Sequence, residues 1–396
     1  MDRRRWAVLF AALVAVRVVA VPIALAERAT DGRRTVLQGD VRRYHKIASA
    51  HGTPYRDFMV EYPPVTLAAI ELLDGTTVRG FTVRLMWSQF LLDVGIALLV
   101  LWGWGRKASL AYLVLGLPFL LYPFVYLRLD LLSVALAVGG LALVRRRRPA
   151  WGGSALAAAC FAKVWPVLLA PSLPVRRSLR GTATFVAAGI VGVGVWLLWA
   201  GTDGPVQVLT LRGARGWEVE STVGALLRTV GAQAVHGERG AWRVGVVPGW
   251  ARIAMPCGFL LATAAVWWTA SRVRPLSRGV LDGLAPLAAI GAFLVLSPII
   301  SPQYLCWLLP FAAIAWAHGE RIAGWLTLGL VALSTVDLLL IKELVDGQAL
   351  PQAMVLARNM LLLGFVGYSG ARLAALAIRR DSSPAPASLA PAEAAA

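Results

Sequence analysis

The stretch GTATFVAAGIVGVGVWLLWA, residues 181–200, decides the fold class of this chain. Its apolar residues fill the block continuously and do not recur at the spacing of a half-buried helix or strand. A second block, IAGWLTLGLVALSTVDLLLI at residues 322–341, is equally long. About 20 predominantly apolar residues in a helix match the thickness of the bilayer core. Because lipid offers the backbone no hydrogen-bond partner, we expect these blocks to be helices.

The composition agrees with that interpretation. Of 396 residues, 58% are hydrophobic and only 15% are charged, and the mean hydropathy is +0.67. The net charge of +18 would suggest nucleic-acid binding in a soluble protein. Here the bases stand between apolar blocks, where they are expected to hold short loops on the cytoplasmic side. Cys160, Cys257 and Cys306 all fall in apolar segments, which argues against a disulfide framework. The richness in Ala, Arg, Gly and Val is typical of a GC-rich bacterial genome.

The charge pattern predicts an all-α polytopic membrane protein with about twelve transmembrane helices and both termini in the cytoplasm. Residues 1–380 would form a single domain, and residues 381–396, rich in Pro, Ala and Ser, a disordered cytoplasmic tail. The N-terminus resembles a signal peptide, but Arg17 interrupts its apolar stretch, so we expect an uncleaved first helix. Two large loops, residues 27–80 and 201–249, are expected outside the cell.

Some segments should depart from plain crossings. Residues 63–73 are short and are expected to be interfacial or re-entrant. Residues 152–174 have bases on both sides, so we expect a hairpin of two short helices broken near residues 163–166. A helix over residues 109–127 is expected to end in an outer turn at 128–130. The other expected crossings include residues 6–26, 81–104, 181–200 and 250–269, and two helix pairs joined outside by residues 297–303 and 342–351.

Several short motifs follow one another in the polar segments. The first outer loop contains Gly39-Asp40 and then Glu61-Tyr62-Pro63-Pro64. A carboxylate shortly after the first helix, followed by Tyr-Pro-Pro, resembles the polyprenol-phosphate-mannose-dependent mannosyltransferases of the GT-C superfamily of membrane glycosyltransferases. The resemblance covers roughly residues 1–370. Further matches occur in order at Arg128-Leu129-Asp130, Ala162-Lys163-Val164-Trp165-Pro166, Glu218-Val219-Glu220-Ser221 and Ser301-Pro302-Gln303-Tyr304. The chain departs from the family in reading Trp217-Glu218 where a more Gln-rich stretch is expected, which leaves the acceptor open.

The resemblance implies a GT-C-like bundle and a reaction at the outer face of the plasma membrane. The donor would be a hexose, with mannose expected, on a polyprenyl phosphate, and transfer would invert the anomeric centre. Such a displacement needs a carboxylate to take the proton of the acceptor hydroxyl, and the resemblance assigns this role to Asp40. An aspartate capping a helix that begins at Val41 is the structural alternative. Asp57 and Glu61 are second choices for the base.

Stabilising the leaving lipid phosphate requires fixed positive charge. The candidates are Lys163, Arg128, Arg215 and Arg358, although Arg358 could instead snorkel to lipid headgroups. Candidates for binding the sugar or the acceptor are Tyr44, Asp57, Glu61, Tyr62, Glu220, Gln303 and Tyr304. No cofactor is expected, and no metal, because the spacing of the outer histidines fits no metal motif. The expected partners are the polyprenyl-phosphate sugar, a glycolipid or glycan acceptor and membrane lipid, but no nucleic acid.

Two other classes of protein remain open on the sequence. A transporter or lipid flippase would need charges at several depths along a central path and two similar halves, whereas polar residues here gather in the two outer loops. A non-catalytic scaffold would leave the constellation from Asp40 to Pro64 unexplained. Arg17 and Asp93 fall at similar depth in the first two expected crossings, where they are predicted to form a structural pair.

Overall fold

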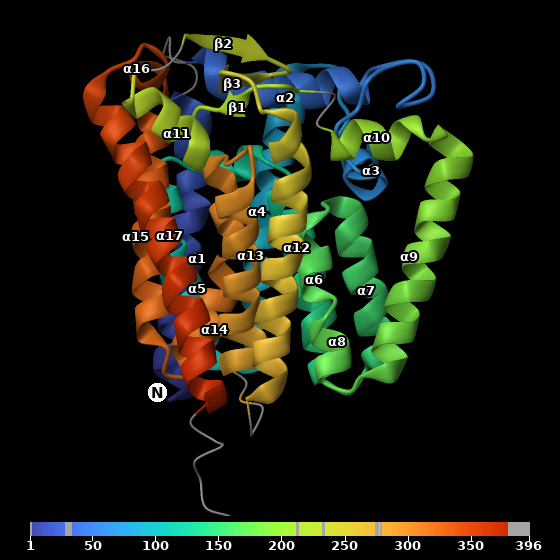
Figure 1. Cartoon of the computed structure of the whole chain (residues 1–396), viewed down its shortest axis with the longest axis vertical. Helices are drawn as coiled ribbons and strands as arrows, with labels where there is room; N and C mark the ends of the chain where they lie inside the picture. The colour runs from blue at the N-terminus through green and yellow to red at the C-terminus, as the bar shows by residue number, and fades with distance from the viewer. Residues whose placement is uncertain are drawn as a thin grey trace, which may run out of the picture.

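The computed structural model of the chain is nearly all-α, with 77% of its residues in helices (Figure 1). It describes residues 2–27, 34–210, 214–231, 234–273, 277 and 279–378. The expected disordered tail, residues 381–396, lies outside these ranges. Most helices run roughly parallel to the long axis of the molecule, and the first turn of α1 and the last turn of α17 lie at the same end of the bundle (Figure 1).

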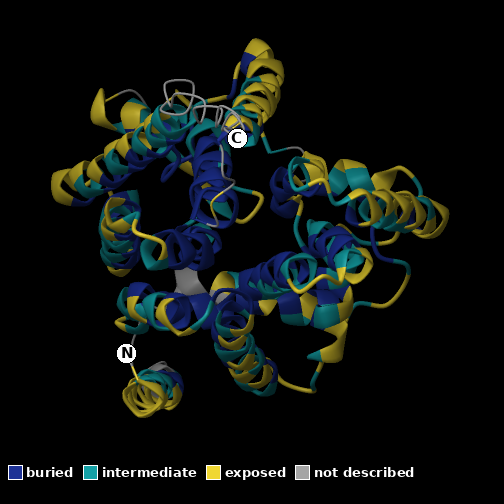
Figure 2. Ribbon diagram, turned by 90° about the horizontal axis from the view of Figure 1, so that it is seen from below, coloured by how far each residue is buried: buried dark blue, intermediate teal, exposed yellow. Residues whose placement is uncertain are grey.

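In the part of the chain that is described, six helices are long and apolar enough to cross a bilayer. Several of them expose their apolar side chains: Leu198 is 85% exposed and Ile190 is 68% exposed, both on α9. Figure 2 shows such outward faces in yellow around a buried interior. Burying this surface in lipid removes the cost of exposing it to water, so the fold is that of a helical membrane protein. The six helices are α1 (Arg3–Glu27), α4 (Val78–Trp104), α9 (Leu179–Ala200), α12 (Gly249–Arg272), α15 (Arg321–Leu339) and α17 (Ala349–Ile378).

The remaining expected crossings are built from shorter, interrupted helices, so the number twelve stays a prediction. The continuous helix expected over residues 109–127 is wrong, because α5 ends at Leu115. Gly116, Pro118 and Pro123 explain the break, since glycine and proline both interrupt an α-helix. The shorter segments are α5 (Arg106–Leu115), η1 (Leu117–Leu120), η2 (Phe124–Leu127), α6 (Asp130–Arg145), α7 (Pro149–Ala162), η3 (Trp165–Leu169), α8 (Ser172–Val175), η5 (Val280–Leu284), α13 (Ala285–Leu296), η6 (Pro302–Trp307) and α14 (Leu309–Ala317).

The structure bears on two local expectations. The hairpin of residues 152–174 breaks where predicted, because α7 ends at Ala162 and Lys163 adopts an extended backbone. The segment after Pro63 forms only α3 (Pro64–Leu72), which has nine residues. A helix of that length extends about 14 Å, which is too short to cross a bilayer.

The two expected outer loops contain folded structure, and it gathers at the end of the bundle opposite the termini (Figure 1). The first loop carries α2 (Arg34–Ala48) and α3, and the second carries a three-stranded antiparallel sheet in the order β1-β3-β2. Trp217 and Val244 of this sheet pack with Ala251 of α12, which fixes the sheet to the bundle. The remaining elements here are α10 (Asp203–Leu209), β1 (Trp217–Glu218), α11 (Thr222–Thr229), β2 (Val235–Glu238), β3 (Ala241–Val244) and α16 (Ile341–Val345).

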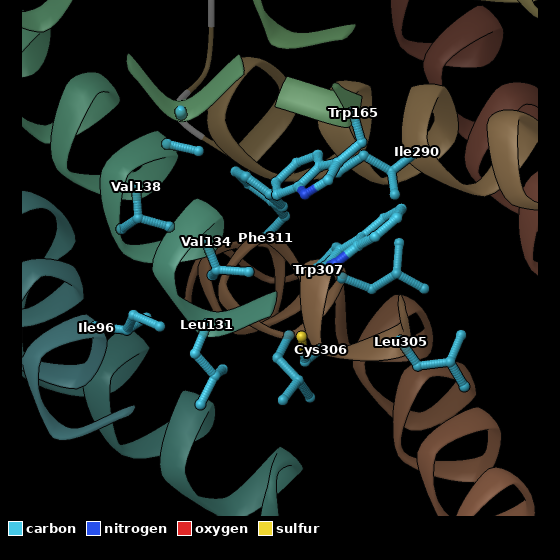
Figure 3. Close-up of a cluster of buried hydrophobic side chains, with 14 of the residues drawn as sticks. Ile96, Leu131, Val134, Val138, Trp165, Ile290, Leu305, Cys306, Trp307 and Phe311 are labelled. Carbon is cyan, nitrogen blue, oxygen red and sulfur yellow. The ribbon is translucent and has the colours of Figure 1, made fainter. Parts of the chain in front are cut away.

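The interior combines an apolar core with paired charges. In Figure 3 the rings of Trp165 and Trp307 lie face to face, 5.2 Å apart, among buried side chains that include Val134 and Phe311. The predicted Arg17–Asp93 pair is present, with Arg17 Nε 2.9 Å from Asp93 Oδ2. Both residues are buried. The pair therefore leaves no uncompensated charge in the apolar interior.

Candidate functional site

Asp40 lies on α2, at the end of the bundle that holds the folded outer loops (Figure 1). Because α2 begins at Arg34, the interpretation of Asp40 as the cap of a helix beginning at Val41 is wrong. Val41, Tyr44 and Ile47 bury one face of α2 against the bundle, as their helical spacing allows. This packing orients Asp40 and fixes its neighbour one turn later, Arg43.

Asp40 lies between two guanidinium groups. Its Oδ2 is 3.0 Å from Arg128 Nη2, and its Oδ1 is 3.3 Å from Arg43 Nη2. Arg43 also contacts Glu61, with Nη1 2.6 Å from Oε1. The Arg128 side chain is buried and the Asp40 side chain is 23% exposed, so this ion pair is only partly shielded from bulk water. The structure thus brings together Asp40, Arg128 and Glu61 from three separate motifs.

Lys163 forms a second ion pair beside the first. Its Nζ is 2.5 Å from Asp130 Oδ1, which also accepts a hydrogen bond of 2.7 Å from Trp307 Nε1. The same ammonium lies 4.5 Å from the centre of the Tyr304 ring and 5.1 Å from that of Trp307. Since Arg128 and Asp130 are two residues apart, the turn at 128–130 joins the Asp40 pair to the Lys163 pair.

Tyr304 lies beside the Lys163 ammonium and Trp307. Its ring stacks on Trp307, with centroids 4.5 Å apart, and neighbouring Gln303 accepts a hydrogen bond of 2.7 Å from the Ser301 hydroxyl. Burial, followed by the negative charges of Glu218, Asp130 and Asp40, raises the pKa of Tyr304 well above its usual value. Carboxylates from three segments of the chain, with both Glu218 and Glu220 in the second outer loop, therefore contribute to the electrostatics of this cluster.

Tyr44 and Tyr62 line the α2 side of the cluster. Their rings meet edge to face at 5.4 Å, and Tyr55 Oη donates a hydrogen bond of 2.6 Å to the Tyr62 carbonyl. Burial first, and then the charge of Asp40, raises the pKa of the Tyr44 hydroxyl, which therefore stays protonated at neutral pH. These contacts hold the Tyr-Pro-Pro segment against α2.

Arg358 occupies a separate, buried position. Its Nη2 donates to the carbonyl of Glu220, and its Nη1 lies 3.6 Å from Glu220 Oε1 and 3.5 Å from Asp337 Oδ2. The guanidinium is 1% exposed, so the alternative of snorkelling to headgroups is wrong. Arg358 ties the second outer loop to α15 and α17. Burial raises the pKa of Glu220 to about 7, even though Arg358 opposes this shift.

Two predicted site residues do not join the cluster through any contact among the described residues. Asp57 is exposed, and its Oδ2 accepts a hydrogen bond of 2.5 Å from the Thr53 backbone. Arg215 is also exposed, and its backbone N–H donates to Glu238 at 3.0 Å. The first contact closes a turn and the second holds the sheet, so both residues shape the outer loops.

Sequence reasoning missed Arg43, Trp307 and Glu218. Arg43 would have been found had residues 34–48 been recognised as a helix, because a residue three positions after Asp40 then shares its face. Trp307 follows the Ser-Pro-Gln-Tyr motif by one turn and carried no signal of its own. In the part of the chain described, no group of three or more His, Cys, Asp and Glu residues is placed to hold a metal ion.

The fold and the cluster define a helical membrane protein with paired charges beneath folded polar loops at one end. No family model matches the chain, and the comparison with curated proteins found no match.

Proposed function

We propose that this chain is a membrane glycosyltransferase. It would move a hexose, with mannose as the first candidate, from a polyprenyl phosphate to an acceptor hydroxyl at the outer membrane face, with inversion. The observation that carries the proposal is the placement of Asp40 between Arg43 and Arg128, beside the Lys163–Asp130 pair. One carboxylate and several cations are the groups that this displacement requires.

The proposed step is a single displacement. The acceptor oxygen bonds to the anomeric carbon, Asp40 takes the hydroxyl proton, and the bond from that carbon to the phosphate oxygen breaks. The electron pair leaves with the lipid phosphate, which gains negative charge. Arg128 and Lys163 are the cations nearest to Asp40 and Tyr304, and each is already paired with a carboxylate that a phosphate can replace.

The test is Asp40→Asn, measured with purified protein and radiolabelled polyprenyl-phosphate mannose in the presence of lipid extract. Asparagine keeps the size of the side chain but cannot take the proton, so turnover should fall by about 10²-fold or more. Donor affinity should not weaken, because Arg128 loses a competing anion. The matched control is Asp57→Asn, which removes an exposed carboxylate of the same outer loop. Its turnover should be normal.

Near-normal turnover by Asp40→Asn would refute the assignment of the base. A transporter would move the donor across the bilayer without consuming it. Formation of a labelled product by the wild type therefore separates the two functions.

A further inference from the structure

Glu218 is a buried carboxyl group that the proposed reaction does not yet use. Its backbone is held on several sides: its N–H donates to Pro298 at 3.0 Å, its carbonyl accepts from Ser221 at 2.9 Å, and it pairs with Arg243 across the sheet. Glu218 is 7% exposed, and its Oε2 has no hydrogen-bond partner among the described residues. The fold therefore fixes the position of this carboxyl group and leaves one oxygen free.

The charges that face Glu218 do not balance it. Arg243 Nη1 donates to the Gly216 carbonyl at 2.8 Å, and its Nε lies 3.7 Å from Glu238. The other nearby cation, Arg358, is shared by Glu220 and Asp337. The remaining groups that influence Glu218 are Asp40 on α2 and Glu220 in the same outer loop, both acidic. Burial first, and then the charge of Glu220, raises the pKa of Glu218 well above its usual value, although Arg243 and Arg358 oppose this shift.

A purely structural role does not account for this side chain. The contacts that hold residue 218 in place are made by its backbone, and any side chain would preserve them. An unpaired polar group in a buried position costs free energy. A buried polar group without a partner in a native protein calls for an explanation, and a role at a binding site is one of them. Among the described residues Glu218 Oε2 therefore lacks a partner, and a bound molecule can supply one.

We propose that Glu218 binds a hydroxyl group of the transferred sugar as a neutral carboxylic acid, an inference that rests on the proposed glycosyltransferase function. In this form it donates one hydrogen bond through its O–H and accepts another through its C=O. Neutrality matters because the site must also accept an anionic phosphate. Arg43, Arg128 and Lys163 are balanced by Asp40, Glu61 and Asp130, so an ionised Glu218 would make the cluster net negative and repel the donor.

The decisive experiment compares Glu218→Gln with Glu218→Ala. Glutamine has the shape and the donor and acceptor groups of the neutral acid, so kcat/KM for polyprenyl-phosphate mannose at pH 7 should stay within about threefold of wild type. Alanine removes both groups and should lower kcat/KM about 10-fold or more. Wild-type activity should also fall as the pH rises through the pKa of Glu218, and Glu218→Gln should lack that alkaline loss.

A set of monodeoxy-mannose donors separates binding from folding. With the wild type, the donor that lacks the contacted hydroxyl should react about 10-fold more slowly than the mannose donor that has it. With Glu218→Ala, the two donors should react at the same rate. A loss caused only by misfolding would be the same for every donor in the set. Such a uniform loss would overturn the proposal.

Thermal unfolding supplies a control that does not depend on activity. The neutral acid is favoured in the folded state, so stability contributed by Glu218 declines as pH rises above its unfolded pKa, and Glu218→Gln should be at least as stable as wild type at pH 8. Glu238→Gln is the matched control, for which the change in stability should have the opposite sign. Although burial acts against it, hydrogen bonds from the Gly216 and Arg215 backbone lower the pKa of Glu238, so this variant should lose stability at pH 8.

If Glu218→Gln is as inactive as Glu218→Ala while the wild type transfers mannose, the proposal fails and the proposed function stands. Normal activity of Glu218→Ala would also overturn it. A wild type that neither binds nor transfers any polyprenyl-phosphate sugar would remove the proposed function, and this inference with it.

Discussion

Replacing Arg17 and Asp93, singly and together, tests whether a buried charge pair organises the first two long helices. Arg17 Nε lies 2.9 Å from Asp93 Oδ2, and Arg17 Nη2 donates to the Leu113 carbonyl at 2.7 Å. Asp93 also accepts hydrogen bonds from Tyr112 Oη at 2.6 Å and Tyr126 Oη at 2.8 Å. The network is therefore asymmetric, because the carboxylate serves donors on three different segments.

This asymmetry determines how much each variant should lose in the free energy of unfolding. Removing one partner of a buried ion pair costs about 3–5 kcal/mol. Arg17→Leu should fall at the lower end, about 3 kcal/mol, because Asp93 keeps both tyrosine donors. Asp93→Leu should cost about 5 kcal/mol, because it leaves the guanidinium and both hydroxyls without their acceptor. If the sites were independent, the double variant would lose about 8 kcal/mol.

The double variant should instead lose only about 2–3 kcal/mol, which is roughly the cost of two unpaired hydroxyls. Adding Tyr112→Phe and Tyr126→Phe should recover most of that remainder, since no buried polar group is then left unpaired. The assay is a denaturant titration of the protein in bicelles, from which the free energy of unfolding is obtained. A double variant whose loss equals the sum of the single losses would show that the two charges do not stabilise each other in the protein.

The remaining predictions concern the phosphate site and the orientation. Lys163→Gln should weaken donor binding about 10-fold, as expected for the loss of a charge-assisted contact, while Lys163→Arg should keep part of the activity. Lys163 would instead be structural if Lys163→Gln lowered the stability and left the donor affinity unchanged. In that case a Lys163→Gln, Asp130→Asn double variant should fold normally again. For orientation, cysteines placed at Asp57 and Arg147 in a Cys257→Ser background should be labelled by an impermeant thiol reagent in intact cells at Asp57 only. The reverse pattern would invert the topology.

The long helices were predictable because each is specified locally, by about 20 apolar residues and flanking charges. The break at Lys163 was predictable for the same reason, since bases on both flanks forced a hairpin. The end of α5 at Leu115 was accessible in principle from Gly116 and Pro118, but the apolar content of residues 109–127 concealed it. Hydropathy measures transfer into lipid and says little about where the helix ends.

The candidate site was only partly accessible because ion pairing is a tertiary property. Asp40, Arg128 and Lys163 stood out as charges next to motifs, and the structure brings them together. Arg358 carried a similar signal, yet it is used to hold Glu220 and Asp337. Glu218 stood in one of the motifs, but a glutamate in a polar loop is ordinarily solvated, and the sequence did not indicate that the folded loop buries it.

The proposed reaction requires the Lys163–Asp130 pair to be stable and yet able to exchange partners, and the helix breaks are consistent with both. Asp130 is the first residue of α6, where the helix dipole favours negative charge, and Lys163 follows the last residue of α7, where it favours positive charge. Trp307 donates to Asp130 in addition. Each charge therefore has a stabilising environment that does not depend on its partner. In the proposed reaction, the donor phosphate would take Lys163 while Asp130 remains supported by the helix and the indole. A pair buried within continuous helices would lack this support, and separating it would cost several kcal/mol.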